Sequence, residues 1–193
     1  MINRILIAAA LLFVLSTPAH AHLLPSEHGS FAAGFSHPLF GLDHILVMVA
    51  VGLWALGAGG RTTWIVPGAF VAMMGVGFAF ALAGGALPYV EPVILASVVA
   101  IGLLIAFAVR LPVAASAMVV GAFAVFHGFA HGTEIGAAGA FAYGTGFAAA
   151  TVLLHAAGIG VGAGLARLQV RGDMIVRALG AGTATAGIAL LAI

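Results

Sequence analysis

This chain is nearly free of charge: it has 6 basic and 5 acidic side chains in 193 residues, and every basic one is arginine. Charged residues make up about a quarter of a typical soluble domain, so these few cannot cover a water-facing surface. The hydrophobic share of 64% and the mean hydropathy of +1.27 point the same way. The sequence therefore predicts an integral membrane protein embedded in a lipid bilayer, with no basic patch that would bind nucleic acid.

Residues 1–21 have the three parts of a secretory signal peptide. Arg4 precedes an apolar run that ends near Leu15, and the segment closes with an Ala-x-Ala pattern at Ala21. This order predicts cleavage after Ala21, so that the mature chain starts at His22. The alternative interpretation is an uncleaved first helix, and in both cases the next segment starts outside the cytoplasm.

Six further apolar segments follow, each close to the roughly 20 residues that a transmembrane helix needs. They lie at 38–58, 63–85, 92–109, 112–132, 138–165 and 174–193. We therefore expect an all-α fold: a polytopic membrane helical bundle with six transmembrane helices in one domain, 22–193, after a cleavable signal peptide.

The arginines predict the orientation of the bundle. If the mature N-terminus is outside, all those beyond the signal peptide fall in or next to cytoplasmic breaks between segments, as the positive-inside rule requires: Arg61, Arg110, Arg167, Arg171 and Arg177. We expect a multi-pass protein of the bacterial inner membrane with periplasmic N- and C-termini. Small residues at Gly-x-x-x-Gly spacing predict close helix packing, and a homo-oligomer is compatible with them.

Histidine is the most frequent ionisable residue, with 8 in the chain, and an ionisable group within a membrane span indicates function because its burial is costly. A first cluster, His37, Asp43 and His44, begins the first mature segment. On a continuous helix His37, His44 and Met48 fall within about 20° of one line, while Asp43 points roughly 120° away. Asp43 would bond to an imidazole N–H, or would reach the same centre if the helix is irregular around Gly41.

A second cluster, His127, His131 and Glu134, ends the fourth segment. The two histidines are four residues apart and share a helix face, which Glu134 continues. This is the geometry of a two-imidazole metal clamp with a carboxylate nearby. Because the first segment runs inward and the fourth outward, both clusters belong to the outer layer of the membrane, and His155 lies deeper in the fifth segment.

Weaker candidates surround these clusters. His155 is either a hydrogen-bonding strut between helices or a functional group, and methionines such as Met48 pack more often than they bind metal. If cleavage frees it, His22 would offer both an amino group and an imidazole to a metal. Glu91, in a proline-containing outer turn, is expected to be simply solvated.

The ligand types limit the chemistry. The chain has no cysteine, and imidazole with carboxylate suits nickel, cobalt, zinc and copper(II) without selecting among them. These ligands lose protons when they bind metal, which predicts a proton-coupled secondary carrier. The absence of a nucleotide-binding loop excludes a self-contained ATP-driven pump. No prosthetic group is expected, and Ni²⁺ or Co²⁺ would be bound only in transit.

The clusters also resemble the two signature motifs of the HupE/UreJ family. The motifs read His37-Pro38-x-x-Gly41-x-Asp43-His44-x-x-x-Met48 and Phe126-His127-Gly128-x-Ala130-His131-Gly132-x-Glu134. The resemblance implies a secondary permease for nickel, in some cases cobalt, encoded with hydrogenase or urease systems. It also implies which motif residues transport requires: His37, Asp43, His44, His127, His131 and Glu134.

Two other functions stay open at this point. A membrane metalloenzyme would use the histidines catalytically, although a zinc hydrolase motif places Glu directly after its first His, where Gly128 stands. A metal sensor or assembly factor would bind ions without moving them. We expect a transporter rather than an enzyme, which takes up nickel or alternatively cobalt across the inner membrane.

Overall fold

The structure is a computed structural model that describes residues 30–135 and 139–192. The predicted signal peptide, together with His22, lies outside the described residues. Seven helices and no strand occur in the described part: α2 Phe31–Phe40, α3 Leu42–Ala58, α4 Thr62–Leu82, α5 Val90–Ala106, α6 Val113–Ile135, α7 Ala140–Ala166 and α8 Val170–Leu191.

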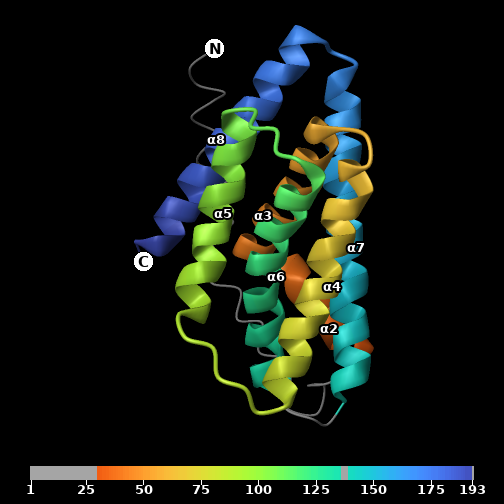
Figure 1. Cartoon of the computed structure of the whole chain (residues 1–193), viewed down its shortest axis with the longest axis vertical. Helices are drawn as coiled ribbons and strands as arrows, with labels where there is room; N and C mark the ends of the chain where they lie inside the picture. The colour runs from red at the N-terminus through yellow and green to blue at the C-terminus, as the bar shows by residue number, and fades with distance from the viewer. Residues whose placement is uncertain (1–29, 136–138, 193) are drawn as a thin grey trace.

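Helices α3 to α7 run alternately up and down the bundle, and α8 descends obliquely beside α5 (Figure 1). The α3–α4, α5–α6 and α7–α8 connections lie at the upper end in this view. All five arginines of the described chain lie in or near these three connections, so we call this the arginine end: Arg61, Arg110, Arg167, Arg171 and Arg177. The opposite end, which carries His37, His44, His131 and Glu134, is called the histidine end.

The prediction of a multi-pass helical membrane protein is confirmed. Four helices, α4, α6, α7 and α8, are long and apolar enough to cross a membrane, and α2 with α3 forms a fifth candidate that is bent by 84°. Helix α5 is apolar but has only 17 residues. The described residues thus hold four or five candidate spans, and the predicted count of six is not confirmed.

The first predicted segment is not one continuous helix, as its interpretation over 38–58 had assumed. The chain is already helical from Phe31, where the Ser30 hydroxyl caps α2 by accepting the amide N–H of Ala33 at 3.0 Å. It then breaks at Gly41, whose backbone is extended with φ −79° and ψ 116°. Pro38 weakens the turn before the break, because it has no N–H and its ring crowds the preceding turn.

This break also corrects the predicted stripe of His37, His44 and Met48. His37 belongs to α2, while His44 and Met48 belong to α3, whose axis is turned by 84°. A calculation on one straight helix therefore does not apply to these three residues.

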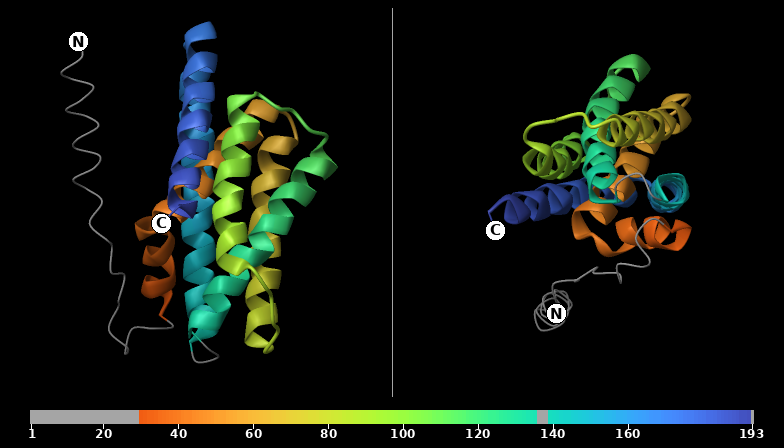
Figure 2. Two further views of the ribbon diagram at one scale, coloured as in Figure 1. Left: turned by 90° about the vertical axis from the view of Figure 1, so that its left-hand side faces the viewer. Right: turned by 90° about the horizontal axis from the view of Figure 1, so that it is seen from below.

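Glycines allow the helices that carry the histidines to pack backbone to backbone. A Cβ at Gly52 of α3 would collide with the carbonyl of His155 in α7, and one at Gly128 of α6 would collide with the carbonyl of Met74 in α4. In lipid, where no hydrophobic drive joins helices, such close approach stabilises the bundle. Helix α2 lies against the part of α7 near the histidine end (Figure 2), and a Cβ at Gly34 of α2 would collide with the carbonyl of Tyr143 in α7.

Candidate metal-binding site

The two predicted histidine clusters meet at the histidine end. The ring centroids of His37 and His131 are 4.5 Å apart, those of His44 and His131 are 4.8 Å apart, and those of His44 and His127 are 5.5 Å apart. Helices α2, α3 and α6 thus bring four imidazoles from sequence-distant segments into one cluster.

The break at Gly41 determines how Asp43 joins this cluster. A Cβ at Gly41 would lie 3.0 Å from both the Asp43 Oδ1 atom and the His44 Nδ1 atom, so the missing side chain leaves room for these two groups to meet. The Asp43 Oδ2 atom lies 2.9 Å from His44 Nδ1. Asp43 therefore takes the first of its two predicted positions, as the partner of an imidazole N–H.

A second carboxylate orients the other central histidine. Glu134 Oε2 lies 3.2 Å from His131 Nδ1. Because an ionised carboxylate only accepts hydrogen bonds, the Nδ1 atoms of both His44 and His131 carry their proton. Their Nε2 atoms then face each other at 2.7 Å. Two lone pairs this close repel each other unless a shared proton or a cation lies between them. The two Nε2 atoms are therefore suited to bind a cation.

The cluster has the dimensions of a metal site. Single ligand atoms of His37, His131 and Glu134 all lie within 4.8 Å of one another. Metal–imidazole bonds of about 2.0–2.1 Å place neighbouring donor atoms roughly 3 Å apart, so small side-chain movements would bring these atoms around one ion. His131 is buried, His37 is half-buried and Glu134 is exposed, so the donors extend from the core to the surface.

A cavity of about 250 Å³ opens beside these donors. Its lining includes Asp43, His44 and Glu134, together with Glu91 from the first turn of α5. The prediction that Glu91 is merely solvated thus missed its place in the cavity wall. The predicted topology already put the turn before α5 in the outer layer, and this was the one sequence signal that could have placed Glu91 near the histidines.

His127 and His155 lie deeper, and both are almost fully buried. The Nδ1 atom of His155 lies 2.7 Å from the carbonyl oxygen of Met48, and that of His127 lies 2.9 Å from the carbonyl of Phe123. Met48 thus contacts His155 through its backbone carbonyl, and its side chain is fully buried in the core. His155 does not join the outer cluster through any described ring contact.

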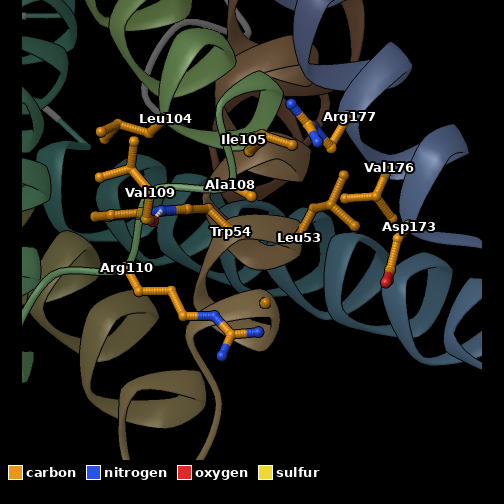
Figure 3. A pocket seen from close by; sticks show the side chains of 11 residues that line it. Leu53, Trp54, Leu104, Ile105, Ala108, Val109, Arg110, Asp173, Val176 and Arg177 are labelled. Carbon is orange, nitrogen blue, oxygen red and sulfur yellow. Dashed lines mark hydrogen bonds between the residues drawn. The ribbon is translucent and has the colours of Figure 1, made fainter. Parts of the chain in front are cut away.

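A second cavity, of about 230 Å³, lies at the arginine end (Figure 3). Arg110 and Arg177 lie on different sides of it, and the Trp54 indole N–H donates to the Val109 carbonyl at 2.8 Å. Asp173 is the acidic residue in its lining. Two cationic side chains beside one carboxylate do not favour a divalent cation, so this cavity is not a candidate metal site.

The bundle and its cluster define a class: a polytopic helical membrane protein with a histidine–carboxylate cluster at one end and its arginines at the other. The particular family follows from comparison of the sequence. A sequence-family model described as HupE / UreJ protein matches residues 9–190. The chain belongs to this family, which confirms the resemblance drawn from its two motifs.

A curated relative supports the same assignment. Protein HupE of Rhizobium leguminosarum bv. viciae is 47% identical over 121 residues, and the match covers 63% of this chain and 63% of the relative. The chain thus matches less than two thirds of that relative's length. No solved structure matches the chain.

Proposed function

We propose that this protein is a secondary transporter that takes up a divalent transition-metal ion, with nickel as the main substrate and cobalt as the alternative. The observation that carries the proposal is the His44–His131 pair, whose Nε2 atoms oppose each other at 2.7 Å while each Nδ1 faces a carboxylate. Membership of the HupE/UreJ family supports it, since the family motifs imply a nickel permease.

In this proposal four imidazoles supply the ligands of the ion: His37, His44 and His131 of the outer cluster, and the deeper His127. Asp43 and Glu134 act as further ligands or as proton acceptors. Glu91 adds negative charge to the cavity wall, and a cavity of one charge sign raises the local concentration of the opposite ion. His155 lies on the path inward from these residues.

The proposed direction of transport follows from the charge asymmetry of the bundle. The arginine end faces the cytoplasm by the positive-inside rule, so the histidine end faces the periplasm and receives the ion there. In this arrangement the mature N-terminus and the C-terminus are periplasmic, and the membrane is the bacterial inner membrane. Protons displaced by the metal couple its entry to the proton gradient.

Uptake of radioactive nickel into cells or proteoliposomes tests the proposal. We expect His44→Ala and His131→Ala each to lower the initial rate at least tenfold, with normal amounts of protein in the membrane. Thr185→Ala is the matched control, since its hydroxyl only bonds to the carbonyl of Ala181 in its own helix at 2.9 Å. Full uptake by both histidine variants contradicts the site.

The same assay separates the alternatives. A sensor or assembly factor would bind nickel in purified form without flux across the vesicle membrane, and so would a metalloenzyme. Flux by the wild-type protein therefore distinguishes a transporter from both of these classes.

A further inference from the structure

Two buried histidines each leave one ring nitrogen without a partner. His127 is 0% exposed and His155 is 1% exposed, and the Nε2 atom of each has no hydrogen-bond partner among the described residues. The Nδ1 atom of His155 reaches the Met48 carbonyl of α3 and so joins two helices, whereas that of His127 faces only the Phe123 carbonyl one turn back in α6. The strut interpretation therefore explains half of the His155 imidazole and leaves its Nε2 atom without a role.

The hydrogen-bond partner of Nδ1 in His155 determines the state of its Nε2 atom. The Nδ1 atom of His155 faces the Met48 carbonyl at 2.7 Å, and a carbonyl only accepts, so Nδ1 carries the proton. The Nε2 atom of the neutral ring is then a bare lone pair. This is the tautomer in which histidine ligates metals, with the other ring nitrogen donating to a backbone carbonyl.

His155 is separated from the outer cluster by one aromatic ring. Phe70 of α4 is fully buried, with its centroid 5.5 Å from that of His127 and 5.1 Å from that of His155. His127 in turn lies beside His44, at 5.5 Å between centroids. The imidazoles thus continue inward from the outer cluster to His127, meet Phe70, and resume at His155.

Helix positions give the order of these residues in depth. From the helix ends at the histidine end, His127 lies 8 residues into α6, Phe70 lies 12 into α4, and His155 lies 15 into α7. At 1.5 Å per residue these positions correspond to about 12, 18 and 22 Å along the helix axes. His155 is therefore the innermost histidine of the described chain.

The surroundings of His155 contain further donor atoms. Thr151 precedes it by one turn of α7, and its hydroxyl lies 3.8 Å from the Met74 sulfur. Met74 follows Phe70 by one turn of α4, so the Thr151–Met74 contact runs beside the Phe70–His155 contact. A hydroxyl and a thioether therefore lie side by side one helical turn from the Phe70–His155 contact.

We propose that the Nε2 atom of His155 is a second, inner binding site for the divalent transition-metal ion, reached from the outer cluster when the Phe70 ring moves. The inference rests on the proposed transport function, because the inner site would hold the ion between its entry at the outer cluster and its release. It assigns His155 a direct contact with the ion.

A single-cysteine variant tests this contact without relying on transport. The chain has no cysteine of its own, so His155→Cys introduces the sole thiol. We expect purified His155→Cys to show a thiolate-to-nickel charge-transfer band on addition of Ni²⁺, which neither the wild-type protein nor Thr185→Cys shows. Absence of that band in a variant that inserts normally overturns the inner site, whether or not the protein transports.

Flux then tests the role of the contact. His155→Asn keeps an N–H that can donate to the Met48 carbonyl and removes Nε2. We expect it to bind nickel at the outer cluster within about twofold of wild type and to lose at least tenfold in uptake rate. If His155→Asn takes up nickel at the wild-type rate, His155 only forms a hydrogen bond between helices, and the inference is overturned. A wild-type protein that shows no flux would instead refute the proposed function.

Discussion

The two ends of the bundle contain cavities of similar volume, about 250 Å³ at the histidine end and about 230 Å³ at the arginine end. Their linings differ in charge. The first contains three carboxylates and three imidazoles, whereas the second contains Arg110 and Arg177 with the single carboxylate of Asp173. Cavity size therefore does not distinguish the candidate cation site from the other cavity, whereas the chemistry of the lining does.

The polar groups at the two ends also have different kinds of partner. At the arginine end, Arg177 Nε donates to the Ala106 carbonyl at 2.8 Å, and Trp54 donates to that of Val109. These bonds satisfy the carbonyl of the last residue of α5 and one carbonyl of the α5–α6 connection. At the histidine end, side chains pair with side chains across helices, as His44 does with His131. Side-chain pairs of this kind can exchange a proton for a metal ion, whereas backbone carbonyl contacts fix the fold.

The largest effect is expected from a substitution that separates the helices behind the histidine end. A Cβ at Gly128 would collide with the Met74 carbonyl, whereas one at Gly160 would meet nothing within 4 Å. We expect Gly128→Ala to lower nickel uptake more than tenfold and to lower the thermal midpoint of the purified protein. Gly160→Ala should leave both unchanged. Equal behaviour of the two variants would show that close α4–α6 packing does not support the cluster.

A smaller effect is expected from pH. Protonated imidazole cannot bind a metal ion, and histidine ordinarily titrates near pH 6.5. Nickel binding by purified protein should therefore weaken as pH falls from 7.5 to 5.5, by about tenfold in all. Equilibrium dialysis between pH 7.5 and 5.5 measures this slope. A dissociation constant that does not change with pH would contradict the proposed exchange of metal for protons at the histidine end.

The smallest effect is expected from the outermost carboxylate. Glu91 is exposed and lines the histidine-end cavity, so Glu91→Gln should raise the KM for nickel about threefold to tenfold and leave the maximal rate nearly unchanged. The effect should shrink at high ionic strength, since screening weakens exposed charges. Asp173→Asn is the matched carboxylate change at the arginine end, and we expect it to leave KM unchanged. A similar rise in both variants would remove the proposed distinction between the ends.

The meeting of the two histidine clusters could be predicted because it depends on two regular features of the chain, the helical repeat and the alternating direction of the spans. The helical repeat puts His127 and His131 on one face, and the alternating direction of the spans puts them in the same outer layer of the membrane as His37 and His44. Neither inference needs a tertiary contact. The family assignment followed from the same residues.

The details that could not be predicted depend on local breaks and on partners far away in the sequence. Hydropathy is high on both sides of Gly41, so it does not reveal the bend there. Helix α5 was predicted to reach residue 109, but it ends at Ala106 because Ala108 adopts φ 52° and the Val109 amide bonds back to the Leu104 carbonyl at 2.8 Å. The bare Nε2 of His155 could not be foreseen, since its Nδ1 partner is the Met48 carbonyl of another helix.

The two carboxylate–imidazole pairs have a mechanical consequence. Asp43 and His44 are neighbours on α3, which packs backbone to backbone on α7, while His131 and Glu134 share α6, which packs in the same way on α4. Each of these two packed helix pairs, α3 with α7 and α6 with α4, therefore carries one carboxylate and one imidazole of the site. A relative slide of these two helix pairs would change the distance between the two Nε2 atoms without disturbing either carboxylate–imidazole pair. In the proposed transporter, such a movement of whole helices would bind one ion or release it.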